Sequence, residues 1–501
     1  MQDRKMNMMS WSFLRPLGQG RRARLPLMAL CAVLTGCAVG PDYQLPVAQV
    51  GSHYKEAEGW KPARPNEEAP RPDWWRGFQD PQLTEMMAEM LESNLTIAQA
   101  EARYRQAQAL VRSAGAGFFP TVGTSASATR SGSGSGGEGT GMGGAGGGTV
   151  SQYSLSANVS WEVDLWGRVR RTVEAGEAGA QASAADLATT RLSMQSTLAQ
   201  TYFQLRAFDV EKELFRQTVE AYARSLEMTQ NRYAAGVAGQ LDVASARTQL
   251  ENARTQMLTL DRQRAQLEHA LAVLLGRPPS QLDLESGMLA RLVPEPPAGL
   301  PSQLLERRPD IAAAERRTAQ ANARIGVAQA AWFPDLTLSA QGGYRGSQWA
   351  QWLSAPFHFW SLGPALALTV FDGGARRGQL DEARASYDEQ VASYRLTVLS
   401  ALQEVEDYLV ELRVLAQEQE TQGRALASAR ESLQLTQNQY DAGLIDYLSV
   451  VQVQATALNA ERAAVSLHLS RLLASVQLMT ALGGGWQAAE LQPEQAGAAG
   501  T

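Results

Sequence analysis

The chain carries an internal duplication, and this feature constrains its fold more than any other. Residues 229–243 read TQNRYAAGVAGQLDV and residues 436–450 read TQNQYDAGLIDYLSV, with eight identities at a constant offset of 207 positions. Residues 94–120 align with 309–334 in a similar way. Two copies of about 200 residues predict one structural plan built twice, rather than an array of short repeats.

Each copy is predicted to form a helix, two strands, a long helix, a turn and another helix. The first helix covers about 82–117, where apolar residues recur at helical intervals, and it stops before Pro120. Residues 152–164, QYSLSANVSWEVD, alternate strictly between polar and apolar side chains, which is the period of a strand with one wet face. The expected strands are, in chain order, about 119–130, 150–164, 335–345 and 361–372.

Two segments predict helices far longer than those of a globular domain. Residues 168–235 and 376–442 contain almost no glycine or proline, and some 65 residues rising ~1.5 Å each give ~100 Å. Their apolar residues recur at mixed spacings of three and four, as a packed array of helices requires. A soluble coiled-coil rod would share these helices, but it would not contain the predicted strands.

The predicted strands cannot close into a barrel within one chain. Outer-membrane barrels begin at about eight strands, and an open sheet edge in lipid leaves backbone groups unpaired. Two chains would enclose little lumen, whereas three chains supply twelve strands. After residue 36, no stretch approaches the ~20 consecutive apolar residues of a membrane helix. We therefore expect a homotrimer that crosses a bilayer by strands.

The start of the chain has the pattern of an export signal. Basic residues at 15–24 precede an apolar core, LMALCAVL at 27–34, and small residues follow. We expect residues 1–36 to be a signal peptide. Their removal takes away six basic residues and one acidic residue, which moves the formal net charge from −6 to −11. So acidic a chain is a poor candidate for nucleic acid, whose phosphates require lysine and arginine in excess.

Cys37 is the one cysteine expected in the exported chain, because Cys31 leaves with the signal. Residues 34–37, LTGC, match the bacterial lipobox, so we expect a diacylglycerol and an N-acyl chain on Cys37. More than one acyl chain gives stable attachment to a membrane. Ala38 is compatible with sorting to the outer membrane. The alternative is an ordinary signal that leaves a free thiol.

The sequence argues against an enzyme. Its histidines are widely separated and show no metal-ligand spacing, and no nucleophile or phosphate-loop motif appears. We therefore expect no catalytic residue, no metal and no cofactor beyond the lipid. The histidines are His53, His269, His358 and His468.

One loop is predicted between the two strands of each copy. Residues 131–148 are rich in glycine and serine and are expected to form a flexible loop. The loop of the second copy contains Trp349, Trp352, Phe357 and Trp360. These aromatic residues could line a membrane interface, and packing within the loop is an equal alternative.

Four further segments carry a family resemblance. LTGCAVGPDYQLP at 34–46 and WWRGFQDPQL at 74–83, together with the strand-to-helix junctions DLWGR at 164–168 and FDGG at 371–374, resemble the outer-membrane factor (TolC-like) family. The likeness is to its lipoprotein (NodT-type) branch, which serves efflux pumps of the resistance-nodulation-division type. It implies a mainly α chain with a membrane β part, whose homotrimer forms a 12-stranded β-barrel continued by a 12-helix α-barrel.

The resemblance also implies function and location. The trimer would be the passive exit duct of a tripartite efflux pump, carrying small molecules from an inner-membrane pump and a periplasmic adaptor across the outer membrane. The alternative is the exit duct of a type I protein exporter, which would share this fold. A neighbouring gene for a proton-driven pump, or instead for an ABC exporter, would distinguish the efflux duct from the protein-export duct. The sequence of the duct does not identify its cargo.

The expected domains follow the duplication. A signal peptide at 1–36 and a lipidated segment at 37–81 precede the first copy at 82–290. The second copy covers 300–485, and a tail covers 486–501.

The duplicated motifs mark the periplasmic tip of such a duct. YAAG at 233–236 and YDAG at 440–443 match the family's Y-x-x-G signature at two helix hairpins. Glycine there permits the left-handed backbone that ends a helix, so a simple helix cap is the alternative. The residues expected to contact the adaptor are Gly236, Val237, Ala238, Gly239, Gly443, Leu444 and Ile445.

The same tips are expected to hold a closed gate. Three copies of Asp446 would form a ring of carboxylates that favours cations, and Asp242 and Asp441 would add charge. Tyr233 and Tyr440 would offer hydroxyls to neighbouring helices. The alternative is that the three acids are solvated charges at helix ends.

Overall fold

The computed structural model describes residues 38–48, 50–51, 53–56, 73–132, 149–294 and 304–487. The expected signal peptide, Cys37, most of the glycine-rich loop and most of the tail lie outside these residues. The described chain forms two compact units. One contains residues up to 41, 115–172 and 325–380, and the other contains 42–114, 173–324 and the remainder from 381.

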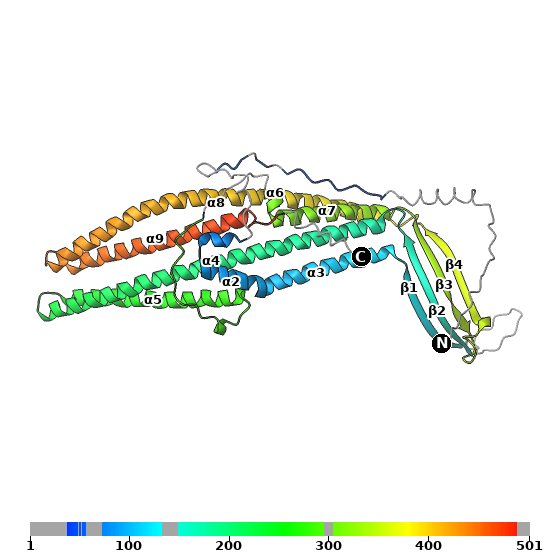
Figure 1. The fold of residues 1–501 in the computed structure, drawn as a ribbon, viewed down its shortest axis with the longest axis horizontal. Coiled ribbons are helices and arrows are strands. Elements are labelled where there is room, and N and C mark those ends of the chain that lie inside the picture. Colours follow the sequence, from blue (N-terminus) through cyan, green and yellow to red (C-terminus); the bar gives the residue numbers. More distant parts are fainter. Residues whose placement is uncertain are drawn as a thin grey trace, which may run out of the picture. The chain divides into compact units, whose positions relative to one another are not determined.

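The duplicated plan predicted from the sequence is present in the structure (Figure 1). The first copy contains β1 (Thr121–Gly132), β2 (Thr149–Val163), α4 (Arg168–Ala234) and α5 (Gln240–Leu274). The second contains β3 (Asp335–Gly346), β4 (His358–Ala367), α8 (Ala375–Asp441) and α9 (Tyr447–Ala481). Both α4 and α8 have 67 residues, and both α5 and α9 have 35.

Shorter elements precede each copy. α2 (Pro81–Ser93) and α3 (Leu95–Gly115) lead into β1, and α6 (Leu304–Arg307) and α7 (Pro309–Ala330) lead into β3. Short 3-10 turns lie at Trp74–Phe78, Ala116–Phe118, Pro279–Gln281 and Ala355–Phe357. Among the residues described here, no helix is both long enough and apolar enough to span a bilayer.

The prediction of a single first helix at 82–117 is wrong, because the chain breaks at Asn94. The backbone of Asn94 is extended, with φ −68° and ψ 122°. Its carboxamide oxygen accepts hydrogen bonds from the amides of Thr96 and Ile97 at 2.9 and 3.0 Å, which caps α3. The side-chain nitrogen Nδ2 of Asn94 donates to the Leu274 carbonyl at 2.7 Å. A tertiary contact therefore fixes a break that helical periodicity does not reveal.

The sheet is antiparallel throughout, in the order β1-β2-β3-β4. Three strands lie within two residues of their predicted bounds. The prediction of 361–372 for the last strand is wrong, since β4 ends at Ala367 opposite Asp335, the first residue of β3. Beyond Ala367 the neighbouring strand offers no partner, so residues 368–371 are unpaired.

An aspartate starts each long helix. Asp164 accepts hydrogen bonds from the amides of Val169 and Arg170 at 3.0 and 3.1 Å. Asp372 accepts from the amides of Gly374 and Arg376 at 3.0 and 3.2 Å. A carboxylate satisfies amides that have no partner within the helix, and it complements the positive end of the helix dipole. These contacts explain the aspartates of the DLWGR and FDGG motifs.

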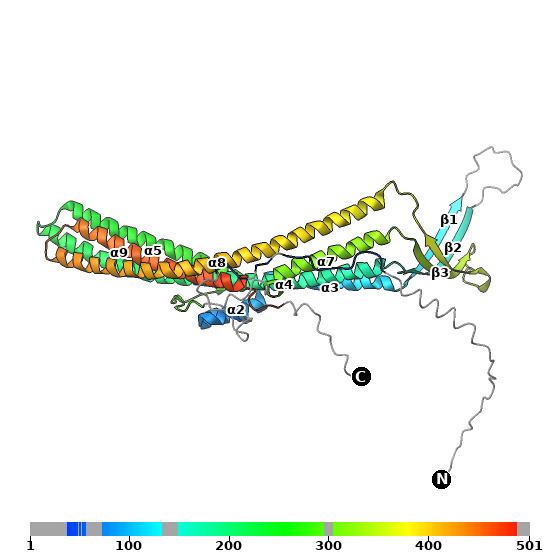
Figure 2. The ribbon, with the colours of Figure 1, turned by 90° about the horizontal axis from the view of Figure 1, so that it is seen from above.

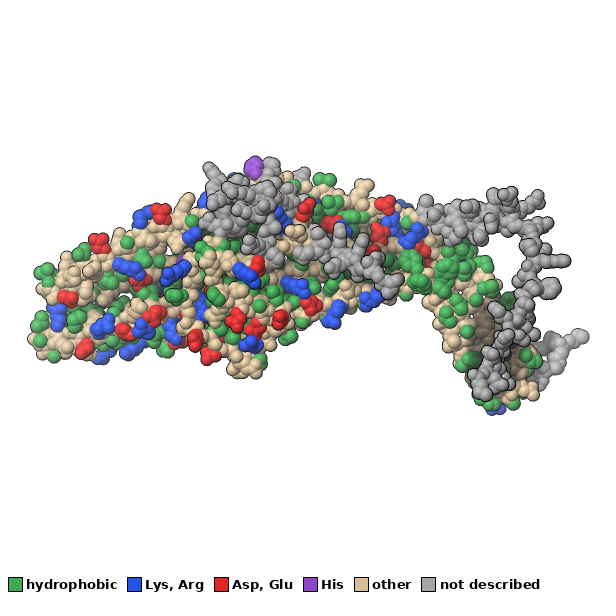
Figure 3. Space-filling model, viewed as in Figure 1, with side chains coloured by type: hydrophobic (Ala, Val, Ile, Leu, Met, Phe, Trp, Pro, Cys, Tyr) green, Lys and Arg blue, Asp and Glu red, His purple; other side chains and the backbone are tan. Residues whose placement is uncertain are grey.

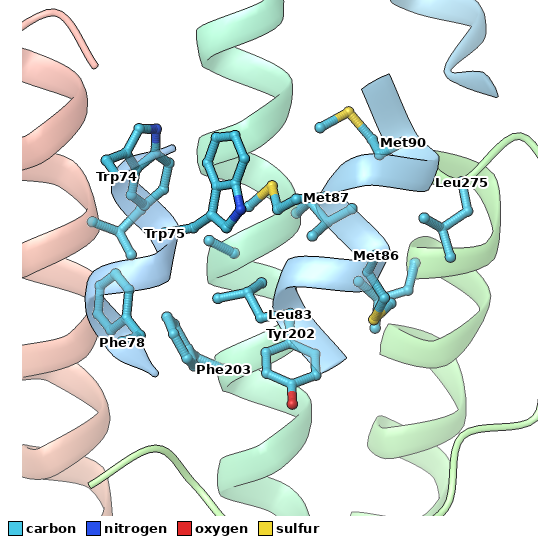
Figure 4. Packing of buried hydrophobic residues seen from close by; sticks show 14 of the residues in the cluster. Trp74, Trp75, Phe78, Leu83, Met86, Met87, Met90, Tyr202, Phe203 and Leu275 are labelled. Carbon is cyan, nitrogen blue, oxygen red and sulfur yellow. The ribbon is translucent and has the colours of Figure 1, made fainter. Parts of the chain in front are cut away.

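The main core lies where α2 and the turn before it pack on the long helices (Figure 4). The Phe78 ring lies 4.9 Å from the Phe203 ring of α4, measured between centroids. The other fully buried side chains of this cluster include Leu83, Met87, Met90, Tyr202, Leu271, Leu275, Leu472 and Val476. The two hairpins, α4–α5 and α8–α9, lie side by side (Figure 2), and Leu458 of α9 packs against the cluster around Phe215 and Leu250.

A buried ionic clasp holds the segment after α5 against α4. Asp209 accepts hydrogen bonds from Arg206 at 2.7 Å, from Arg264 at 2.7 Å and from the Gly287 amide at 3.0 Å. Arg206 also donates to the Glu285 carbonyl at 2.8 Å. Only 2% and 1% of the side-chain surfaces of Arg206 and Asp209 are exposed. We call Arg206, Asp209 and Arg264 the clasp.

Candidate functional site

One face of the sheet is apolar. The register aligns the alternating apolar residues of β2 with those of its neighbours, so that Val159 lies beside Val122 and Ala340, and Ala340 beside Leu362. The same face carries Tyr153, Leu155, Ala157, Trp161, Val163, Leu336, Leu338, Tyr344, Trp360 and Leu366. Hydrophobic side chains gather on the visible side of the sheet (Figure 3). Apolar positions 153–163 span eleven residues, close to the ~9–11 that a tilted strand needs to cross a bilayer.

The other face of the sheet is small and polar. It is lined mainly by serine, threonine and glycine, with hydroxyls paired across strands at 2.9 Å for Ser125 and Ser156 and 2.7 Å for Ser127 and Ser154. Within the described strands its charged residues are Glu162, Asp335 and Arg345. One apolar and one polar face match a wall between lipid and water.

The sheet has two open edges. β1 pairs only with β2, and β4 pairs only with β3, within the chain as described. Each edge presents backbone groups that need a partner strand if the sheet lies in lipid. The geometry therefore calls for further copies of the chain.

At the end of α4 and of α8, the two hairpin turns have the same geometry. Gly236 and Gly443 adopt φ +76° and +75°, a left-handed conformation suited to glycine. The amide of Gly236 donates to the Tyr233 carbonyl at 2.9 Å, and that of Gly443 to the Tyr440 carbonyl at 2.9 Å. The next amide of each turn also donates back into its helix at 2.9 Å. These pairs of bonds end both helices in Schellman fashion.

The turns expose apolar side chains. Val237 is 68% exposed and Leu444 is 74% exposed, and the Leu241 and Leu448 side chains that follow are also exposed. Ala238 and Ile445 are half-buried, and Gly239 precedes α5 as its N-cap. Exposed apolar residues at both turns are suited to contact with another protein.

The two tips contact each other within one chain. The guanidinium of Arg232, in the last turn of α4, lies 4.6 Å from the centroid of the Tyr440 ring at the end of α8. Tyr440 packs against Tyr447 at 5.7 Å between ring centroids, and the Ser225 hydroxyl donates to the Tyr447 hydroxyl at 3.2 Å. Tyr440 and Tyr447 are both buried, and burial raises the pKa of Tyr447. We call the contact of Arg232 with Tyr440 the tip tie.

The three predicted gate acids all lie at helix ends. Asp446 is the N-cap of α9 and accepts hydrogen bonds from the Ser449 hydroxyl at 2.6 Å and amide at 3.0 Å, which lower its pKa. Asp242 accepts a hydrogen bond from the amide of Gly239, the N-cap residue of α5, at 3.0 Å. Asp441 accepts from Gln437 at 3.1 Å. Asp446 and Asp242 therefore cap helices as well as carrying charge.

The structure brings Tyr440 into the contact between the tips but leaves Tyr233 half exposed on its own hairpin. Sequence reasoning missed Arg232, Tyr447 and Ser225. Arg232 and Tyr447 face Gln439 and Gln240 in the repeat alignment. A difference between otherwise matched copies was the available signal, because the second copy has Gln439 where the first has Arg232 and so cannot repeat this cation–π contact.

The residues after Cys37 are fixed at the helix end of the sheet, where the strands join the helices. The Val39 amide donates to the Trp166 carbonyl at 3.0 Å, and Arg171 donates to the carbonyls of Val39 and Gly40 at 3.3 Å. Gly167 has φ +82°, and a Cβ there would lie 2.8 Å from the Ala38 Cα. This close approach holds the backbone against the start of α4.

Comparisons with known proteins point to one family. The family described as "Outer membrane efflux protein" matches residues 86–277 and 300–484. The chain is 31% identical over 468 residues to a protein of Pseudomonas putida named probable efflux pump outer membrane protein TtgC, covering 93% of this chain and 96% of that one. It is 33% identical over 467 residues to the pyoverdine export outer membrane protein OpmQ of Pseudomonas aeruginosa, covering 92% and 97%.

Solved structures have the same fold. The outer-membrane channel OprN aligns with a TM-score of 0.82 and 31% identity, over 90% of this chain and 100% of that one. The Campylobacter jejuni outer membrane channel CmeC aligns with a TM-score of 0.84 over 90% of this chain and 96% of that one, at 23% identity. The second likeness concerns the fold alone.

Proposed function

Because the chain belongs to the outer membrane efflux protein family, we propose that it is the passive exit duct of a tripartite efflux pump for small molecules. The observation that carries this function is the two-faced sheet, apolar on one side and lined with small polar side chains on the other. The relatives are channel proteins, so the chain is not an enzyme.

Assembly as a homotrimer is the simplest way to complete the sheet. Three copies join β4 of one chain to β1 of the next and give twelve strands, which leaves no edge in the membrane. Exposed apolar residues of α8, such as Leu396 and Leu399, would then be covered by a neighbouring chain.

Deleting the gene is expected to make cells sensitive to small toxic compounds, since the pump would lose its outlet. Growth inhibition by solvents, dyes and antibiotics measures this, and a plasmid-borne copy should restore tolerance. A defect confined to the secretion of one protein, with drug tolerance unchanged, would favour the type I exporter instead. The names of the relatives, which concern efflux and pyoverdine export, support the small-molecule duct.

We propose that the closed gate lies at the tips. Contacts between the two hairpins and a ring of carboxylates would both contribute to it. The tip tie and the Tyr440–Tyr447 packing hold the second hairpin against the first. Three copies of Asp446, Asp242 and Asp441 would surround the aperture with carboxylates. The lowered pKa keeps Asp446 ionised at neutral pH, and the charge is lost only as pH falls through that lowered pKa.

Arg232→Ala is expected to raise the conductance of the closed duct in planar bilayers. A cation–π contact contributes ~0.5–2 kcal/mol, so losing three shifts the balance toward the open state by roughly tenfold or more. Arg216→Ala is the matched control, because Arg216 lies on the same helix and its ion-pair partners among the described residues are the exposed Glu213 and Glu220. Equal conductance of the two variants would place the gate elsewhere.

Asp446→Asn separates the charge from the cap, because asparagine caps helices as well as aspartate does. Loss of cation selectivity without helix fraying would support the carboxylate ring. Unchanged selectivity would leave Asp446 as a cap alone.

Lipidation of Cys37 is proposed from the lipobox, and Cys37 itself lies outside the described residues. The position of Ala38 beside Gly167 is consistent with this anchor, because the described chain begins at the helix end of the sheet. Mass spectrometry of the N-terminal peptide should show diacylglycerol and an N-acyl chain. An unmodified thiol on Cys37 would contradict the proposal.

The partners are proposed to be a periplasmic adaptor and, through it, an inner-membrane pump of the resistance-nodulation-division type. The support is the pair of exposed apolar turns, Val237 to Gly239 and Gly443 to Ile445.

A further inference from the structure

The polar face of the sheet changes its charge from one end to the other. At the helix end it carries Asp335 and Glu162, and Glu162 pairs with Arg168. The middle rows are neutral, as in the row of Gly123, Asn158, Gln341 and Ser361. Arg345 lies in the last row of β3 on this face, opposite Ser154, and is the one cation on this face of the described strands; on the same face, β1 and β2 continue beyond that row with uncharged residues. The end that carries the loops is called the loop end.

Arg345 is held over an aromatic ring rather than by an acid. Its guanidinium lies 4.9 Å from the centroid of the Phe359 ring. No carboxylate among the described residues lies within ion-pair distance of it. The Arg345 side chain is exposed, and its neighbours in the row, Ser127 and Ser154, are short. The guanidinium is therefore available to another anion.

The residue opposite Phe359 is a glycine that the spacing of β2 and β3 requires. Gly343 lies directly opposite Phe359 on β3. A Cβ at 343 would lie 2.1 Å from the Leu155 carbonyl oxygen and 2.7 Å from the Ser156 Cα, so a larger residue would force β2 and β3 apart. Gly343 therefore keeps β2 and β3 paired in the row next to Arg345.

We propose that Arg345 and Phe359 form the last selective contact of the duct, a cationic and aromatic ring at the loop end that favours organic anions. The inference rests on the proposed function, because three copies of the chain must place their polar faces around one lumen. Arg345 would pair with a carboxylate, sulfonate or phosphate of the departing molecule, and Phe359 would pack against its apolar part. Rings of arginine favour anions in other pores.

The test uses purified trimers in planar bilayers, in an Arg232→Ala background, so that the tips do not dominate the current. Under a KCl gradient at about 0.1 M, Arg345→Gln is expected to raise the potassium-to-chloride permeability ratio about threefold. The change should shrink near 1 M salt, where charges are screened within ~3 Å. Phe359→Leu, which keeps the charge but frees the side chain, should give a smaller change.

Arg130→Gln is the matched control. Arg130 lies on β1 opposite Ser151, near the same end of the sheet but on the apolar face. Arg130 carries the same charge and receives the same substitution, but it does not lie on the polar face. The potassium-to-chloride permeability ratio of this variant should therefore stay unchanged. If Arg345→Gln and Arg130→Gln shift the ratio equally, the ring is refuted.

A second measurement uses naphthalene-1,3,6-trisulfonate as an anionic aromatic blocker, added from the loop side. It should block Arg345→Gln at least about tenfold more weakly than the parent channel, because an exposed guanidinium–sulfonate pair is lost. Equal block of the two would overturn the proposal. If the wild-type protein forms no channel, the proposed function is contradicted. If it forms channels whose selectivity and block do not change on substitution of Arg345, only the proposed ring is contradicted.

Discussion

Leu362→Arg is expected to prevent the chain from assembling into stable trimers in the outer membrane. Leu362 lies in the middle of β4 on the apolar face, beside Ala340, and is 75% exposed in the single chain. A charged side chain on the lipid side near the bilayer centre costs ~2–4 kcal/mol. Three copies therefore lose ~6–12 kcal/mol, which is comparable to the whole ~5–15 kcal/mol stability of a typical folded domain.

The adjacent residue supplies the control. Ser361 lies on the polar face, beside Gln341, and is also exposed. Ser361→Arg places the same charge one residue away on the water side, so assembly should continue. A heat-resistant trimer on a denaturing gel, recovered from the outer-membrane fraction, measures both variants. Equal recovery of the two would mean that the faces do not separate lipid from water.

Asp209→Ala is expected to destabilise the helical unit by about 3–5 kcal/mol, because it leaves the buried guanidinium of Arg206 without its carboxylate. It also removes the acceptor for Arg264 and for the Gly287 amide. The segment after α5 would then detach from α4. We expect a large drop in the helix melting temperature and faster tryptic cleavage after Arg291, which is exposed.

The same helix contains a matched pair that should behave differently. Glu213 and Arg216 have the same three-residue spacing and a 2.6 Å ion pair, but 51% and 52% of their side-chain surfaces are exposed. Water screens such a pair, so Glu213→Ala should leave the melting temperature unchanged. Similar shifts for Asp209→Ala and Glu213→Ala would show that burial of the clasp does not decide its effect.

The buried pair Arg206–Asp209 and the exposed pair Glu213–Arg216 also show which features can be predicted from the sequence and which cannot. Alternation over 152–164 predicted a two-faced strand, and the near absence of glycine and proline predicted α4 and α8 to within one residue at each end. Both signals are local, since they depend on which residues follow one another. Nothing local distinguishes Arg206 and Asp209 from Arg216 and Glu213, because burial is decided by segments that pack from elsewhere in the chain.

The site residues also divide into those with a local sequence signature and those fixed by contacts with distant segments. The left-handed glycines of the tips were predicted because a helix end has its own sequence signature. The tip tie joins Arg232 to Tyr440, 208 positions later, and no periodicity reports such a contact. The break at Asn94 likewise depends on the Leu274 carbonyl, 180 positions away.

Because the sheet has open edges, the yield of assembled trimers depends on how fast the chains associate. Each newly exported chain carries two open strand edges, on β1 and on β4, which can pair with a correct neighbour or with any other exposed strand. Closing the ring requires three chains to meet, so its rate rises more steeply with local chain concentration than the loss of single chains to proteases does. The number of finished ducts should therefore respond to gene expression as a threshold rather than in proportion.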